Sequence, residues 1–228
     1  MNPNDINLAV IELAAKELEP LLDQLTLVGG CAVGLLITDP TRPAVRATID
    51  VDLLTEVTSL VDYYALSNEL TNLGFVLSGD IVCRFRKGGL IVDVMPTHND
   101  VLGFGNAWYP AAFEQALQLN LPSGRKIRHV SGPFCLATKL EAFHGRGNGD
   151  YMHHDIEDLV NLIDGRPELT EEVRSGNADL RDYLEEQFEG LLGDNRFIEA
   201  IPQHFHPSED HGRRLPMVIE RMRRIAGL

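Results

Sequence analysis

The sequence has no apolar run close to the roughly 18 to 20 residues that a membrane-spanning helix needs. Its start, residues 1–5, also lacks the basic region of a secretory signal. There are only three cysteines, and their spacing fits neither a disulfide framework nor a paired metal-ligand motif. We therefore expect a cytoplasmic protein with free, structural thiols and no membrane partner.

Positive charge is also scarce, because 20 Lys and Arg residues stand against 34 Asp and Glu residues and give a formal net charge of −14. An acidic surface repels polynucleotide phosphates, which argues against broad, nonspecific nucleic-acid binding. Local basic groups do occur at 84–87, 125–129 and 213–224. They are open to two interpretations, protection of sheet edges and helix ends or a local binding site.

Three aspartates stand inside otherwise apolar, strand-like patterns. Asp50 and Asp52 lie in the run 48–54, and Asp93 is the only charged residue of the run 90–95. Side chains two apart on a strand point to the same face, so Asp50 and Asp52 are expected to project together. Converging carboxylates are costly to bury unless a cation pairs with them. Magnesium prefers a few carboxylates together with substrate phosphates, so the sequence predicts a magnesium site and phosphoryl-transfer chemistry.

The strand predicted over 47–54 also places other groups relative to these aspartates. Arg46 and Thr48 share the period-2 face of Asp50, whereas Ile49 is expected to face the other way. A guanidinium and a hydroxyl are therefore predicted beside the metal site.

The pair Gly29-Gly30 lies between a predicted strand at 25–28 and a predicted helix over 31–37. Bare backbone amides at a helix N-terminus can bind phosphates, because no side chain blocks their approach. A Gly-Gly pair alone is also typical of any tight turn. Its position, one helix and one loop before the aspartates, favours a phosphate site.

The remaining patterns indicate an α+β protein. Further elements are predicted as helices over 4–23 and 59–73, strands over 75–77, 81–86 and 90–95, a glycine turn over 87–89, and a hairpin over 117–130. From 132 onward the pattern is helical to the end. We therefore expect a catalytic domain over residues 1–131, with a mixed β-sheet flanked by helices, and a helical domain over residues 132–228.

Taken together, Gly-Gly, a helix, Arg-x-Thr-x-Asp-x-Asp and a lone Asp on a later strand resemble the polymerase-beta-like nucleotidyltransferase superfamily. Within it, the chain is similar to the minimal and abortive-infection (AbiEii-like) toxin nucleotidyltransferases. These also carry a helical second half with a Lys and a later Asp-x-x-Asp-Leu, which correspond here to Lys139 and to Asp155-Ile156-Glu157-Asp158-Leu159. The resemblance covers about 25–163.

The resemblance implies an enzyme that transfers a nucleoside monophosphate from a nucleoside triphosphate such as ATP to a hydroxyl group and releases pyrophosphate. Asp50 and Asp52 would hold two Mg²⁺ or Mn²⁺ ions. Asp93 would complete the second metal site and help to remove the proton of the acceptor. The acceptor would be a hydroxyl on RNA, on a protein or on a small molecule.

The resemblance also implies a nucleotide site. Gly29, Gly30 and the Cys31 amide would line the β- and γ-phosphates, and Lys139 would reach the triphosphate as a point charge. Asp155 would orient Lys139 or a neighbouring arginine. A role as the toxin of a toxin–antitoxin or phage-defence system, with an antitoxin protein as partner, is consistent with these relatives.

The chain departs from the family pattern in two places. The interval from Gly30 to Asp50 is long and contains two prolines, which predicts an extra loop over the site, and Cys31 replaces a small hydroxyl residue. Two other functions stay open, a catalytically silent nucleotide-binding or interaction module on the same fold and a metal-dependent phosphohydrolase. Zinc binding by His204, His206 and His211 is a weaker alternative, because cysteine partners are missing.

Overall fold

The computed structural model describes residues 5–228, which form two compact units. We call them the sheet unit, comprising 5–34 and 46–131, and the helical unit, comprising 35–45 and 132–228. The predicted α+β fold, a mixed sheet flanked by helices and then a helical C-terminal half, is confirmed. The division into domains at 131 stays a prediction, and the structure groups 35–45 with the helical unit.

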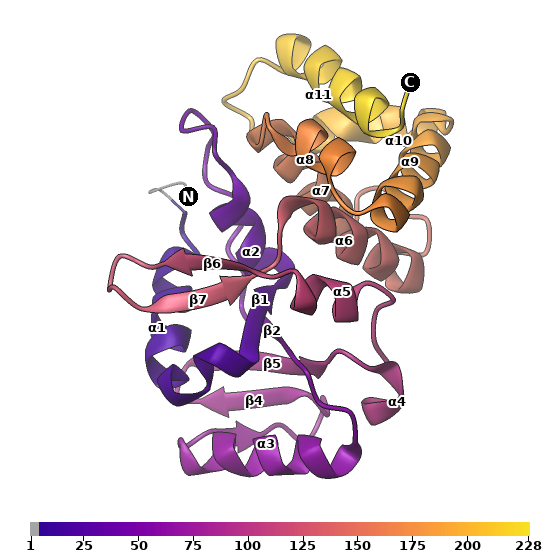
Figure 1. The fold of residues 1–228 in the computed structure, drawn as a ribbon. Helices are drawn as coiled ribbons and strands as arrows, with labels where there is room; N and C mark the ends of the chain where they lie inside the picture. The colour runs from indigo at the N-terminus through magenta and orange to yellow at the C-terminus, as the bar shows by residue number, and fades with distance from the viewer. Residues whose placement is uncertain (1–4) are drawn as a thin grey trace. The chain divides into compact units, whose positions relative to one another are not determined.

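The sheet unit is built on one seven-stranded mixed sheet (Figure 1). Its strands are β1 (Leu25–Val28), β2 (Val51–Thr55), β3 (Val76–Leu77), β4 (Arg84–Lys87), β5 (Leu90–Pro96), β6 (Leu117–Asn120) and β7 (Lys126–His129). Their order across the sheet is β3-β4-β5-β2-β1-β7-β6. β2 runs parallel to β5 and β1 parallel to β7, whereas the other neighbouring pairs are antiparallel. Segments from three separate parts of the chain therefore meet at β1, β2 and β5.

Apolar side chains explain why the central strands are buried. All four residues of β1 are buried, as are four of the five residues of β2. Helix α1 packs against β2 and β5, and α5 packs against β2. The helices of this unit are α1 (Leu8–Glu17), α2 (Gly29–Leu36, which continues into the helical unit), α3 (Leu60–Asn72), α4 (Asn99–Leu102) and α5 (Tyr109–Glu114).

The N-terminal helix is shorter than the predicted 4–23. Helix α1 ends at Glu17, and a 3₁₀ helix, η1, follows over Glu19–Gln24. Pro20 has no amide hydrogen to donate, so the α-helical ladder cannot continue through it. Asn4, where the predicted helix begins, lies outside the described residues.

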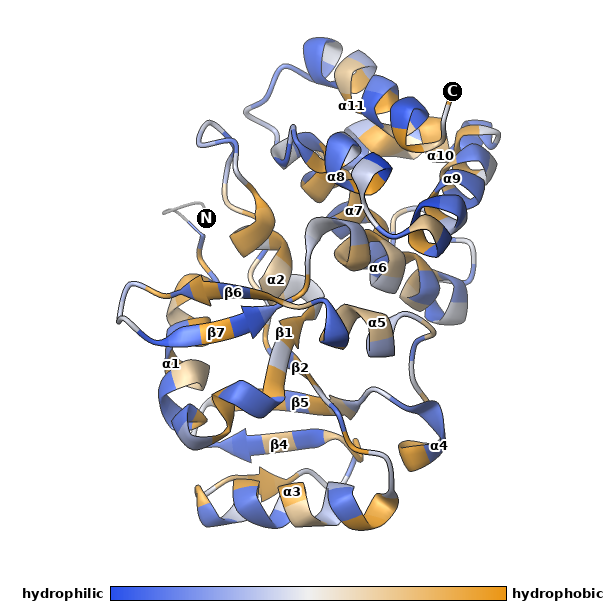
Figure 2. Ribbon diagram, in the orientation of Figure 1, coloured by the Kyte–Doolittle hydropathy of each residue, from blue (hydrophilic) through white to orange (hydrophobic). Residues whose placement is uncertain are grey.

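The helical unit packs its amphipathic helices around a shared apolar core. Its elements are α6 (Gly132–Arg146), α7 (His154–Gly165), α8 (Leu169–Ser175), α9 (Ala178–Leu192), α10 (Asn195–Ala200), the 3₁₀ helix η2 (Ile201–His204) and α11 (His211–Ile225). Hydrophobic and hydrophilic residues alternate along α9 and α11 (Figure 2). The buried residues include Leu136, Leu159, Phe188 and Met222, one from each of four helices.

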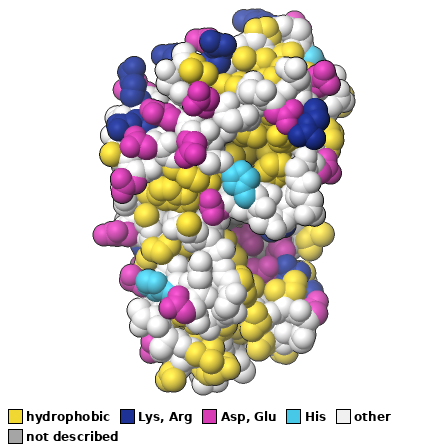
Figure 3. All heavy atoms as spheres, turned by 90° about the vertical axis from the view of Figure 1, so that its right-hand side faces the viewer, with side chains coloured by type: hydrophobic (Ala, Val, Ile, Leu, Met, Phe, Trp, Pro, Cys, Tyr) yellow, Lys and Arg dark blue, Asp and Glu magenta, His cyan; other side chains and the backbone are white. Residues whose placement is uncertain are grey.

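Charges of both signs are mixed on the surface. On the face drawn in Figure 3, acidic and basic side chains stand among hydrophobic ones, and no large area carries basic side chains alone. Within residues 5–228, no helix combines the length and the apolar character that a membrane crossing requires.

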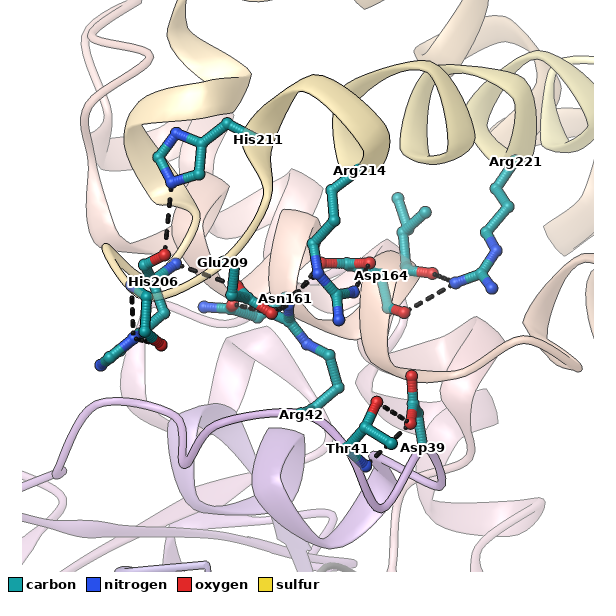
Figure 4. Close-up of polar contacts among 12 residues, drawn as sticks. Asp39, Thr41, Arg42, Asn161, Asp164, His206, Glu209, His211, Arg214 and Arg221 are labelled. Carbon is teal, nitrogen blue, oxygen red and sulfur yellow. Dashed lines mark hydrogen bonds and ion pairs between the residues drawn. The ribbon is translucent and has the colours of Figure 1, made fainter.

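The proline-containing loop after α2 is tied into the helical unit by Arg42 (Figure 4). Arg42 is only 3% exposed, and its guanidinium pairs with Asp164 at 2.5 Å and with Glu209. It also donates a hydrogen bond to the side chain of Asn161 at 3.0 Å. Arg214 of α11 supplies a second cation, 2.7 Å from Asp164. A buried carboxylate needs such partners, so this network fixes the loop. That the loop lies over the candidate site stays a prediction.

We expect Arg42→Met to lower the free energy of unfolding by about 3 kcal/mol, because it leaves buried carboxylates with one cation fewer. Arg213→Met is the matched control, since Arg213 is exposed on α11 and its loss removes the same charge. Urea unfolding of both variants measures the difference. Equal losses of stability would contradict a structural role for the Arg42 ion pairs.

Candidate functional site

Strand register places three charged residues in one row across the sheet. Arg84 of β4 is paired with Asp93 of β5, and Asp93 is paired with Asp52 of β2. On β1 the partner of Asp52 is Val28, which directly precedes Gly29. Residues paired in this way lie side by side, with their side chains on the same face of the sheet. The structure therefore brings Asp52 and Asp93 together, next to the Gly-Gly turn.

Arg84 joins this row to Asp50. Its Nε and Nη2 atoms lie 2.8 Å and 2.7 Å from the two carboxylate oxygens of Asp93, and Nη2 lies 2.5 Å from Asp50 Oδ2. The hydrogen bond to Asp93 raises the pKa of Arg84 still further, so the guanidinium stays charged. The side chains of Arg84, Asp50 and Asp93 are 17%, 31% and 11% exposed. The carboxylates are thus neutralised internally but remain within reach of solvent.

Gly29 allows β1 to turn into α2 directly beside Asp52. Its φ is +70°, in the left-handed region, and a Cβ atom there would lie 1.9 Å from Asp52 Oδ2. Only glycine meets both conditions. Because α2 begins at Gly29, the backbone amides of Gly29, Gly30 and Cys31 belong to its first turn, where a helix favours negative charge.

The segment before β2 corrects one prediction. Strand β2 begins at Val51, so 47–50 is not part of it, and Asp50 lies in a bend. The reason is Asn7, whose side-chain amide donates to the Arg46 carbonyl at 3.1 Å and accepts from the Thr48 amide at 2.9 Å. These hydrogen bonds replace those that the backbone would otherwise make to a neighbouring β-strand.

The predicted two-residue alternation therefore fails before Val51. Ile49 is 80% exposed instead of facing the core. The shared face predicted for Arg46, Thr48, Asp50 and Asp52 does not form, because only Asp52 lies in a strand. The Thr48 hydroxyl instead lies 2.7 Å from Cys31 Sγ.

Cys31 has a structural contact rather than a reactive one. Burial raises the pKa of its thiol to about 12, and the thiol donates to the Asp50 carbonyl at 3.4 Å. A thiol with such a pKa is not a nucleophile near neutral pH. Its side chain supports the backbone at Asp50, while its amide stays in the first turn of α2.

Lys139 and Asp155, the other predicted nucleotide ligands, lie in the helical unit. Lys139 Nζ pairs with Asp158 at 2.5 Å and with Asp155 at 3.2 Å, and all three side chains are less than 10% exposed. Arg146 binds Asp155 with two hydrogen bonds, at 2.8 Å and 2.9 Å. Although burial works in the opposite direction, Arg146 and Lys139 lower the pKa of Asp155 to about 2. Both predicted residues are therefore members of one buried ionic cluster.

Within residues 5–228, only His153, His154 and Asp155 bring three potential ligand atoms all within 4.8 Å of one another. Asp155 is wholly buried and is paired with Lys139, which is itself only 8% exposed and cannot move into solvent to make way for a metal ion, so the group does not fit one.

The three C-terminal histidines engage in local hydrogen bonds. His204 Nε2 lies 2.8 Å from the Tyr151 carbonyl, and His206 Nδ1 lies 2.7 Å from Ser208 Oγ. His211 Nε2 lies 3.2 Å from the His206 carbonyl (Figure 4). These contacts give the three rings structural partners within the helical unit.

Two residues of the site were missed by sequence reasoning. The sequence leaves Arg84 open to two interpretations, edge protection or a local binding site, whereas the glycine turn at 87–89 sets the register that pairs it with Asp93. Counting back from that turn would have found it. Asn7 had no such signal, because its partners are 39 and 41 residues away.

We expect Gly29→Ala to destabilise the sheet unit by about 3 kcal/mol, since a methyl group would force Asp52 out of place and strain a left-handed φ. Gly88→Ala is the control, because Gly88 has φ +58° but nothing within 4 Å of its added Cβ. Gly88→Ala should lower the free energy of unfolding by only about 1 kcal/mol, the cost of placing alanine at a positive φ. Urea unfolding checks this, and equal losses would show that the approach to Asp52 is unimportant.

We also expect the buried cluster to make stability depend on acid pH. Because the folded-state pKa of Asp155 lies below its unfolded value, its contribution is present above about pH 4 and is lost as the pH falls toward 2. The loss should reach about 2 kcal/mol. Urea unfolding between pH 7 and pH 2 should give a flatter profile for Asp155→Asn than for wild type. The exposed control Asp182→Asn should follow wild type, and an unchanged profile for Asp155→Asn would refute this assignment.

Comparisons with known proteins give a similarity of fold. No protein-family model matches the chain, and a search of curated proteins finds no match either. Among solved structures, an antigenic nucleotidyltransferase-like protein from Paracoccidioides brasiliensis is 20% identical, with 86% of this chain and 91% of that chain covered and a TM-score of 0.48. JHP933 from Helicobacter pylori is 12% identical, with 97% and 92% covered and a TM-score of 0.50. The chain therefore has a fold similar to that of JHP933.

Proposed function

We propose that the protein is a magnesium-dependent nucleotidyltransferase, which transfers a nucleoside monophosphate from a nucleoside triphosphate to a hydroxyl group. One observation carries this proposal. Two carboxylates on neighbouring strands, Asp52 and Asp93, lie in register beside a turn where Gly29 leaves the backbone bare at the start of a helix. Carboxylates and free amides at one place suit a metal ion and the phosphates that it accompanies.

By residue type the donor set suits a hard divalent cation, although the oxygens of the three aspartates do not all lie within 4.8 Å of one another, so a bound ion would have to draw them together. Asp50, Asp52 and Asp93 offer oxygen ligands and lie at or close to the solvent-accessible surface. Their negative charges need a nearby cation, and Arg84 supplies one to Asp50 and Asp93. Bound Mg²⁺ or Mn²⁺ would neutralise charge on the attacking and leaving oxygens of the displacement.

The chain's own groups would divide the remaining work. The amides of Gly29, Gly30 and Cys31 would bind the β- and γ-phosphates at the start of α2. Asp93, which is more buried than Asp50 and Asp52, would hold the acceptor hydroxyl and help to take its proton. Lys139 and Asp155 are assigned to the nucleotide through the family resemblance alone.

The acceptor is proposed only by class, as a hydroxyl on RNA, a protein or a small molecule. The net charge of −14 and the mixed surface in Figure 3 do not favour a long polynucleotide. A role as a toxin, controlled by an antitoxin protein, belongs to the same proposal.

A catalytically silent module is the second candidate, and one observation favours it. Arg84 pairs with both Asp50 and Asp93 without any metal, so a cation already offsets part of their charge in a protein that does no chemistry. The two candidates differ in whether labelled nucleotide is transferred.

Label transfer from the four radiolabelled nucleoside triphosphates, with magnesium and cell lysate as the source of acceptors, tests the proposal. We expect wild type to label an acceptor and Asp50→Asn/Asp52→Asn to lose at least about a hundredfold in rate, because the metal ligands are gone. Asp100→Asn, an exposed aspartate on α4, is the matched control and should retain the wild-type rate.

Metal-dependent nucleotide binding by wild type without any transfer would favour the silent module. Transfer that persists in the double variant would overturn the proposed roles of Asp50 and Asp52.

A further inference from the structure

The positive charge at the aspartates comes from the chain itself. Arg84 grips both oxygens of Asp93 and reaches Asp50 with the same Nη2 atom, at distances between 2.5 Å and 2.8 Å. It comes from β4, directly opposite Asp93 on β5, so the backbone pairing holds it there. These are also oxygens that a divalent cation would need.

We propose that Arg84 is a built-in counter-cation, which keeps the carboxylates assembled without metal and must release Asp50, Asp93 or both when a metal ion binds. This inference rests on the proposed metal site. A guanidinium and a divalent cation on the same oxygens would repel each other strongly at such distances. Arginine cannot lose its charge near neutral pH, so a metal ion has to displace it.

The partial exposure of the group makes this exchange feasible. The Arg84 side chain is 17% exposed and that of Asp50 is 31% exposed, so the guanidinium can move toward solvent without being buried unpaired. Breaking a fully buried pair would be far more costly. Arg84 therefore lowers the affinity for free metal while it protects the site from the mutual repulsion of its carboxylates.

Binding of Mn²⁺ alone, followed by electron paramagnetic resonance without nucleotide, tests this role. Arg84→Met removes the charge but keeps a side chain of similar length, and we expect it to bind Mn²⁺ at least about tenfold more tightly than wild type. Arg86→Met is the matched control, because Arg86 lies two residues along on the same face of β4, is paired with Ile91 and donates a hydrogen bond to Ser78 at 3.3 Å. Its affinity should stay within about twofold of wild type.

Thermal unfolding gives a second readout. Without metal, Arg84→Met should melt below wild type because its carboxylates repel, and Mn²⁺ should raise its melting temperature more than that of wild type. Arg84→Lys keeps the charge but loses the bidentate contact with Asp93, so its melting temperature should fall between those of wild type and Arg84→Met. It replaces Arg84→Met in the test if that variant does not fold.

The outcomes separate the two proposals. The role of Arg84 is overturned if Arg84→Met binds Mn²⁺ no more tightly than wild type. The metal site itself still stands in that case if wild type binds Mn²⁺ and Asp50→Asn abolishes the binding. Absence of Mn²⁺ binding in wild type and in both Arg84 variants overturns the metal site and the counter-cation together.

Discussion

The pairing of β2 with β1 on one side and β5 on the other is the constraint on which the candidate site depends. It aligns Val28, Asp52 and Asp93 across three strands, although they are separated by 24 and 41 positions of sequence (52 − 28 and 93 − 52). Because a shift of one residue would turn every side chain of a strand to the opposite face, this alignment depends on the apolar packing of the strands. The buried residues of β2 therefore determine the geometry of the site as much as its aspartates do.

The ionic cluster around Asp155 and the one around Asp50 and Asp93 use the same chemistry with different results. Asp155 is wholly buried, and its partner Lys139 is 8% exposed, so their pairing is fixed by the cost of leaving either charge alone. Asp50 and Arg84 are partly exposed, and water can replace either partner. Burial, rather than the number of charges, thus separates an ionic cluster that stabilises a fold from one whose partners can exchange.

Local patterns in the sequence predict much of this fold and the neighbourhood of the site. The strand at 25–28, the helix after the Gly-Gly pair, the turn at 87–89 and the helical second half all follow from short-range hydrophobic spacing and turn chemistry, and the structure confirms them. The roles of Asp50, Asp52 and Asp93 are still predictions, because they depend on ligands that the chain does not itself contain.

What the sequence did not reveal depends on long-range contacts. Residues 46–48 alternate like a strand, but Asn7 of the N-terminal segment takes up their backbone hydrogen bonds. In the sequence Arg84 resembles a surface arginine, and only its pairing with Asp93 on the neighbouring strand makes it part of the site. The contacts of Asn7 have no local signal, since they join segments that only folding brings together, whereas the Arg84–Asp93 pair follows from the register of one hairpin.

The grouping of 35–45 with the helical unit has a consequence for anyone who wishes to divide the protein. Within residues 5–228 the backbone passes between the two units three times, at 34–35, 45–46 and 131–132. A fragment that ends at 131 would carry Arg42 without Asp164, and its complement would carry Asp164 without Arg42. Each half would then expose a surface that is covered in the whole protein, so we expect the two halves to aggregate when they are expressed separately. Cleavage within an exposed loop leaves both members of each ion pair present.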